Sequence, residues 1–235
     1  MIACSMERDL FILDTDPVRH ENGQTPRQAT RSPPELGTLC PLLVASDVRF
    51  QVVAKTLRLT SAAAQILDDV QFLTTSILQS GTESLERTRI RNTASWLHGR
   101  LTQAKLNILE DEENLTGAAI SQAAIIYTWA ISSGKPMSSY VGQSLRPGLL
   151  ASVQGVRLTR WKQIPGIYLW IVLVACSGVP GDMIGRFWRR KVAVATSAIA
   201  FENFPLGISC VSSFLQVQRW LADEEERAAD GDEES

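Results

Sequence analysis

The residues that could do chemistry in this chain are few and widely spaced. Only two histidines occur, His20 and His98, and the sequence marks no partner for either one. We interpret His98 as a polar histidine on a helix surface, because a triad or metal site based on histidine would rest on it alone. There is no Gly-x-Ser-x-Gly nucleophile elbow, and the glycines of GVPGDMIGR, 178–186, are not followed by the Lys-Ser/Thr pair of a phosphate-binding loop.

Carboxylates and cysteines also lack the spacing of a site. The acidic pairs and runs are Asp68-Asp69 and EDEEN, 110–114, which we interpret as a solvated helix face and a helix-capping loop. The four cysteines are far apart in sequence: Cys4, Cys40, Cys176 and Cys210. This spacing is unlike a disulfide framework or a zinc knuckle and favours a reducing compartment. The sequence predicts no catalytic, cofactor-binding or metal-binding residues, and no cofactor.

Charge is unevenly distributed along the chain. The net charge is −2, yet residues 223–235 hold eight acids and one arginine, so the rest of the chain carries +5. The strongest basic cluster is RFWRRK, 186–191, which suits a nuclear-localisation signal or a phosphate-binding patch; its pattern favours arginines on the outer face of a helix. We interpret the acidic run as a solubilising tail, with an activation segment as the alternative.

From residue 46 onward the apolar residues recur at helical spacing. In the segment 61–79 they place Ala64, Leu67 and Leu78 near one face. The segment 82–106 has a candidate inward face, with arginines left outside, formed by Leu85, Ile90, Trp96, Leu97 and Leu101. The next helix, over 114–133, is predicted to begin at the cap Asn114 and to end at Gly134 in the left-handed conformation before Pro136. A final helix is predicted to begin at Pro205, after a break at ENFP.

The least polar stretch is IYLWIVLVACSGVPGD, 167–182. Nineteen uncharged residues separate Lys162 from Asp182, about enough to cross a bilayer. However, Pro165-Gly166 and Gly178–Gly181 interrupt both ends, and basic residues flank both sides. We therefore predict a buried core helix over 167–177, packed against 115–133 and 206–221, with a membrane anchor through 164–184 as the alternative. The five tryptophans from Trp129 onward are interpreted as core anchors rather than a ligand cage.

The predicted fold class is all-α: a single multi-helix domain of six to eight packed helices. Residues 1–45 are predicted to be a mostly disordered N-terminal arm, because 14–41 is rich in proline and poor in apolar residues. Residues 46–222 form the helical domain, and 223–235 are predicted to be a disordered acidic tail. Hydrophobic residues make up 45% of the chain and charged residues 20%, which is typical of a globular domain.

The order of elements over about 115–221 resembles the C-terminal half of the fungal-specific transcription factor domain, the helical regulatory region of fungal binuclear zinc-cluster regulators. The resemblance lies in a series of apolar segments: AAIIYTWAI, Pro136, LLASVQGVRLTRW, IPGIYLWIVLVACSGVPGD, RFWRRKV and SFLQVQRWL. The residues that fill the aromatic and small positions of that pattern are Trp170, Ala175, Gly178, Phe187, Trp188, Phe214 and Trp220.

The chain departs from that family at its N-terminus. Members that bind DNA carry six closely spaced cysteines that hold two zinc ions, whereas here Cys4 and Cys40 stand thirty-six residues apart. The resemblance therefore implies a regulatory domain without its own DNA reader: a nuclear, or alternatively cytoplasmic, regulator that acts through a protein partner. That partner could be a full-length zinc-cluster regulator, and the chain by itself is expected to show no specific DNA binding. The alternatives are a helical small-molecule enzyme and the membrane-associated protein.

Overall fold

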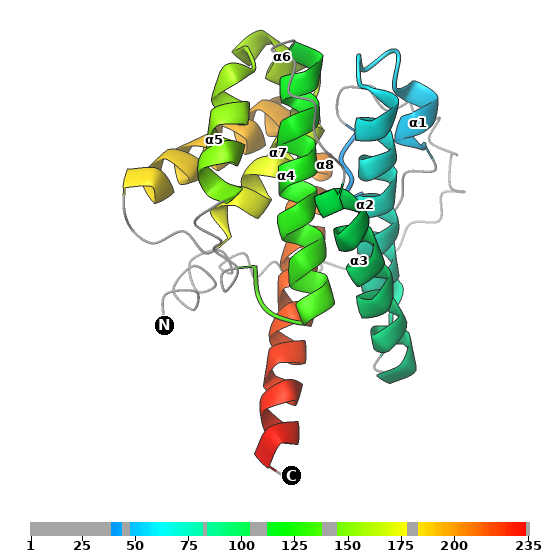
Figure 1. Ribbon diagram of the computed structural model, residues 1–235. Helices are drawn as coiled ribbons and strands as arrows, with labels where there is room; N and C mark the ends of the chain where they lie inside the picture. Colours follow the sequence, from blue (N-terminus) through cyan, green and yellow to red (C-terminus); the bar gives the residue numbers. More distant parts are fainter. Residues whose placement is uncertain are drawn as a thin grey trace, which may run out of the picture. The chain divides into compact units, whose positions relative to one another are not determined.

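The computed structural model describes residues 39–43, 48–81, 84–103, 112–137, 145–177 and 183–233. These residues form eight α-helices and no strand, which confirms the all-α prediction (Figure 1). The helices are α1 (Phe50–Val53), α2 (Ser61–Gln79), α3 (Ser84–Gln103), α4 (Glu112–Ser133), α5 (Leu145–Gly155), α6 (Leu158–Gln163), α7 (Pro165–Cys176) and α8 (Met183–Glu233).

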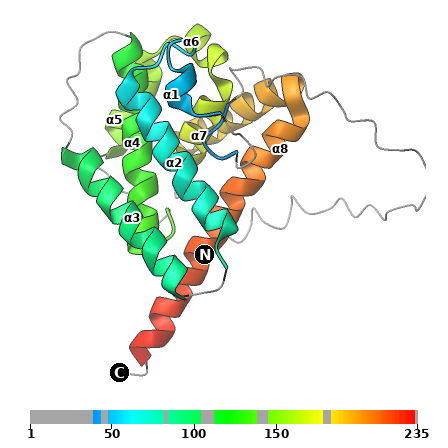
Figure 2. The ribbon, with the colours of Figure 1, turned by 90° about the vertical axis from the view of Figure 1, so that its right-hand side faces the viewer.

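Helix α4 is the element on which the others converge. It contacts α2, α3, α5 and α7, and α7 in turn packs along α8 (Figures 1 and 2). Its small residues allow this crowding, since four alanines of α4 are fully buried: Ala119, Ala123, Ala124 and Ala130. The core therefore lies where α2, α4, α7 and α8 meet.

The apolar stretch is a core helix, as predicted. Every residue of α7 from Pro165 to Ala175 is buried, and the helix packs against α8 and α4. Its twelve residues span about 18 Å, which is well short of a ~30 Å hydrocarbon core. In the described part of the chain, one other stretch, Leu115–Ser133 of α4, is long and apolar enough to cross a membrane, and 72% of it is buried inside the fold.

Local capping signals set several helix ends. Thr60 caps α2, because its side chain accepts a hydrogen bond of 3.2 Å from the backbone of Ala63. Gly134 has a φ of +63° and ends α4 as predicted, while Lys135 N–H bonds back to Ala130 O at 3.2 Å. The predicted cap Asn114 is wrong, because α4 already begins at Glu112.

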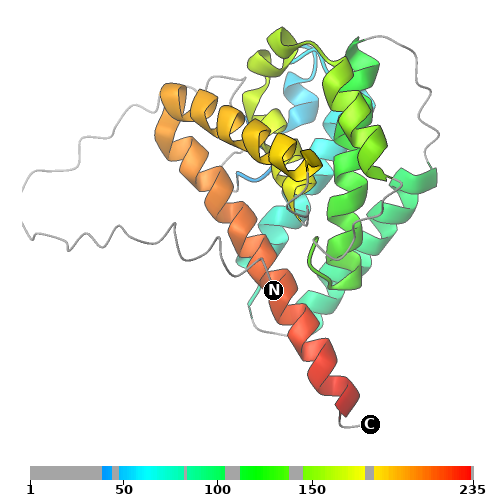
Figure 3. The same ribbon diagram turned by 90° about the vertical axis from the view of Figure 1, so that its left-hand side faces the viewer.

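Pro205 lies inside a helix rather than at the start of one. The predicted break at ENFP is wrong, since α8 runs for 51 residues from Met183 to Glu233 with Pro205 within it. Proline removes one backbone donor and crowds the preceding turn, which bends a helix without necessarily ending it. Figure 3 shows the result: the two halves of α8 diverge from a sharp bend in the orange part of the ribbon.

The predicted disordered acidic tail, 223–235, is corrected by the same helix. Its residues up to Glu233 continue α8, and Glu224 is buried. Arg87 Nη1 of α3 lies 2.7 Å from Glu224 Oε1, with Arg91 and Arg227 at 3.8 and 3.4 Å from the same carboxylate. A carboxylate buried among three guanidinium groups ties the end of α8 to α3.

The predicted N-terminal boundary also moves. Residues 39–43 fall inside the arm predicted over 1–45, yet Leu39, Cys40 and Leu42 belong to the core. Gln71 Nε2 of α2 donates to Leu43 O at 3.2 Å and holds this segment against the domain. The rest of the arm, 1–38 and 44–45, lies outside the described residues.

Candidate functional site

The polar residues that could have formed a catalytic centre have structural roles. His98 on α3 is half-buried, with Nδ1 at 3.3 Å from Ile125 O and 3.4 Å from Thr128 Oγ1. Asp68 accepts hydrogen bonds from the backbone N–H groups of Phe50 and Gln51 and so caps α1, as the capping interpretation predicted for this pair. His20 and Glu110-Asp111 lie outside the described residues, and the side chains of 112–114 are not described.

Three cysteines lie within the described chain. Cys40 and Cys210 are both buried, and Cys176 is half-buried. Burial and a hydrogen bond with the Cys210 thiol raise the pKa of Cys40, so both thiols behave as core groups. The sequence gave no signal for this pairing, because the two residues are 170 positions apart. No group of three or more metal-ligating side chains is found among the described residues.

Two tyrosines in the core have perturbed pKa values. Burial raises the pKa of Tyr168 to about 12. Burial also raises the pKa of Tyr127, whose hydroxyl lies 2.8 Å from Thr74 Oγ1; that hydrogen bond acts in the opposite direction. Neither hydroxyl is poised to ionise near neutral pH, so these groups support the fold and not proton transfer.

We expect this burial to make the protein sensitive to alkali. An unfolded tyrosine ionises near pH 10, so the stability that Tyr168 contributes is complete below about pH 10 and is lost as the pH rises through about 12. The loss should approach about 2 kcal/mol, and Tyr168→Phe should reduce it. Urea unfolding at a series of alkaline pH values measures this difference. An unchanged alkaline profile in Tyr168→Phe would contradict the assignment.

An exposed aromatic surface on α2 and α3 is the candidate functional site. Trp96 was predicted to face inward with Leu85, but their exposed fractions are 64% and 63%, whereas Ile90, Leu97 and Leu101 are buried as predicted. Phe72 of α2 is likewise 60% exposed. Large aromatic side chains of this exposure are unusual at positions without a partner. We call Phe72, Trp96, Arg100 and Asp69 the α2–α3 surface.

The α2–α3 surface is held together by charge. Arg100 Cζ lies 5.0 Å from the centre of the Trp96 ring, and the Arg100 guanidinium is paired with the Asp69 carboxylate across the two helices. Gln65 Nε2 donates to Asp69 Oδ1 at 3.0 Å and fixes that carboxylate from the same helix. Phe72 follows Asp69 by three residues and Trp96 precedes Arg100 by four, so each aromatic residue lies on the same face of its helix as the ion pair.

The tryptophans of the C-terminal half are mostly core residues. Trp161, Trp170 and Trp220 are buried, and Trp129 is half-buried against the core. Ala175 and Phe214 are buried too. Of RFWRRK, the side chains of Arg186, Arg189 and Arg190 are exposed, as predicted for a helix outer face, while those of Phe187 and Trp188 are not described. Gly178 lies outside the described residues.

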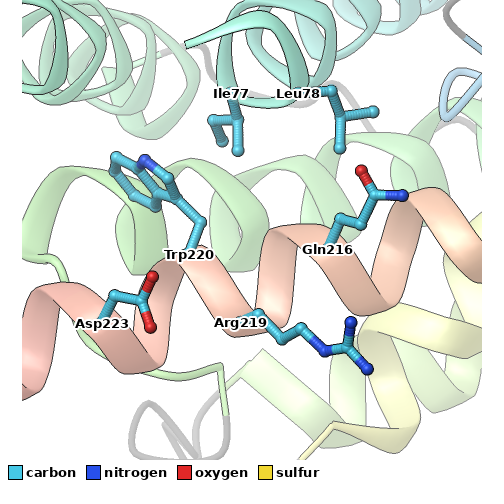
Figure 4. Close-up of a pocket in the computed structure, with 6 residues that line it drawn as sticks. All are labelled: Ile77, Leu78, Gln216, Arg219, Trp220 and Asp223. Atoms are coloured by element: carbon cyan, nitrogen blue, oxygen red, sulfur yellow. The ribbon is translucent and has the colours of Figure 1, made fainter. Parts of the chain in front are cut away.

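A small open pocket lies between the end of α2 and the second half of α8 (Figure 4). Its volume is about 190 Å³, and it is lined by Ile77, Leu78, Gln216, Arg219, Trp220 and Asp223. Typical small-molecule sites measure about 300–1,000 Å³, so this pocket is smaller than they are. The α2–α3 surface is therefore the stronger candidate for a functional site.

Comparisons with protein-family models, with curated proteins and with solved structures found no match to this chain.

Proposed function

We propose that this chain is a transcription-regulator-like helical interaction protein that acts in the nucleus by binding a protein partner rather than by reading DNA itself. The observation that carries the proposal is the α2–α3 surface, where Trp96 and Phe72 are exposed beside an arginine. Tryptophan and arginine are enriched among the residues that dominate binding energy at protein interfaces. Such a surface is also what a regulator needs if it must act by contact.

The regulatory part of the proposal rests on the resemblance of 115–221 to the fungal transcription factor domain. Its all-helical character and its buried apolar helix α7 are compatible with that pattern. A full-length zinc-cluster regulator is the partner that this resemblance suggests, since such a partner would supply the six cysteines and the basic region. Two zinc ions held tightly by the purified chain would refute this division of labour.

Replacing both aromatics of the α2–α3 surface is expected to abolish partner binding. In Phe72→Ala/Trp96→Ala, the partner that co-purifies with tagged wild-type chain from fungal nuclei should be lost, with affinity falling by a factor of about 30 or more if each residue contributes about 1–2 kcal/mol. The melting temperature should stay within the range of surface substitutions, because both side chains are exposed.

The matched control is Leu158→Ala. Leu158 is 54% exposed on α6, so its truncation removes a similar exposed apolar side chain outside the α2–α3 surface. Partner binding should survive in this variant. Equal binding by wild type and the double variant would refute the role of the surface. A chain that stays in membranes, or that purifies alone and turns over a small molecule, would refute the proposed function itself.

A further inference from the structure

Helix α8 carries opposite charges at its two ends. Between Met183 and Phe201 the sequence holds four basic residues and no acid, and Arg186, Arg189 and Arg190 are exposed. At the other end, Asp223, Glu225 and Glu226 are exposed. The two halves diverge from the bend near Pro205, so within one chain the basic half and the acidic end point away from each other (Figure 3).

Exposed apolar side chains lie between the two charged ends. Val194 is 51% exposed, Ile208 52% and Leu215 36%. Ile208, Ser212, Leu215 and Ala222 recur at spacings of three, four and seven residues, so they follow one face of the second half of α8. A face of this composition has the apolar centre and charged rim of a protein interface.

The charges are placed symmetrically about the bend. Arg189 precedes Gly207 by 18 residues, and Glu226 follows Ile208 by 18 residues. A twofold axis passing near Ile208 would therefore bring the basic half of one copy onto the acidic end of a second copy. It would do so twice, because an isologous contact repeats each pairing.

We propose that α8 is a self-association surface on which two copies of this chain pair antiparallel, with Arg189 and Arg190 of each copy facing Glu225 and Glu226 of the other. A second copy fits this surface better than a nucleic-acid backbone does, because a polyanion would engage the arginines alone. It would leave Ile208 and Leu215 exposed and would be repelled by the acidic end. The surface lies on a different helix from the α2–α3 surface and is independent of the proposed function.

Measuring mass in solution by light scattering or sedimentation tests the pairing. The wild-type chain at about 0.05 M salt should show twice the mass of one chain, and this should fall toward the single-chain mass at about 1 M salt, where the Debye length is about 3 Å. Arg189→Glu/Arg190→Glu should be monomeric, because two acidic surfaces then face each other. Glu225→Arg/Glu226→Arg should be monomeric for the converse reason.

Mixing the two charge-reversed variants is the decisive step. In the mixed dimer both contacts again join opposite charges, so dimer mass should return although neither variant dimerises alone. Far-UV circular dichroism and melting temperature verify that each variant is folded, and neither variant alters the buried Glu224. A wild-type chain that stays monomeric at about 0.1 mM, a value near the weak end of specific association, would overturn the proposal. A mixture that stays monomeric, or a monomer whose arginines bind duplex DNA, would overturn it as well.

Discussion

Replacing Glu224 with alanine is expected to lower the free energy of unfolding by about 3–5 kcal/mol, because the buried Arg87 guanidinium loses its carboxylate. The two side chains are 10% and 8% exposed and lie 2.7 Å apart. Arg87 also lies 5.8 Å above the Trp220 ring, so it cannot turn to solvent without leaving that contact. Chemical denaturation followed by circular dichroism measures the loss.

The neighbouring Glu225 provides the control. Glu225 is exposed on the same helix, so Glu225→Ala should change the stability by no more than about 0.5 kcal/mol. A chain truncated after Leu221 should be destabilised like Glu224→Ala, although the sequence alone predicts a dispensable tail. Arg87→Met/Glu224→Leu should recover most of the loss, since apolar residues of similar volume often replace a buried ion pair without cost. Equal stability of Glu224→Ala and Glu225→Ala would show that the ion pair contributes nothing.

Replacing Trp170 with alanine is expected to cost about 3–5 kcal/mol, as large-to-small changes of buried aromatics do. Trp170 is fully buried in α7, and its ring meets the Tyr127 ring edge-on at a centroid distance of 6.3 Å. The substitution therefore opens a cavity between α7 and α4. Thermal and urea unfolding measure the effect.

Trp96→Ala is the matched control for Trp170→Ala. The same chemical change at a 64% exposed position should leave the stability within about 0.5 kcal/mol of wild type. A similar melting temperature for the two variants would contradict the core assignment of Trp170. The comparison also separates folding from partner binding, for which Trp96 is the proposed residue.

Local pattern by itself determined the helical class and several helix ends. The stretch 167–177 has no polar face, so only a position enclosed on all sides suits it, and α7 is fully buried. Gly134 ends α4 because glycine tolerates the left-handed conformation at little cost. Both features depend on residues close together in sequence, which is why the sequence predicted them.

Only the tertiary structure decided which surfaces are covered and which segments are recruited. Trp96 has the spacing of a core residue, but α3 packs on α4 with a different stripe and leaves the ring outside. Glu224 looks like part of a solvated acidic run, and its burial requires Arg87, 137 positions earlier. Pro205 reads as a helix start, yet helix α8 bends at it and continues on both sides. Periodicity identifies the faces of a helix, whereas the packing of distant helices selects the face that is buried.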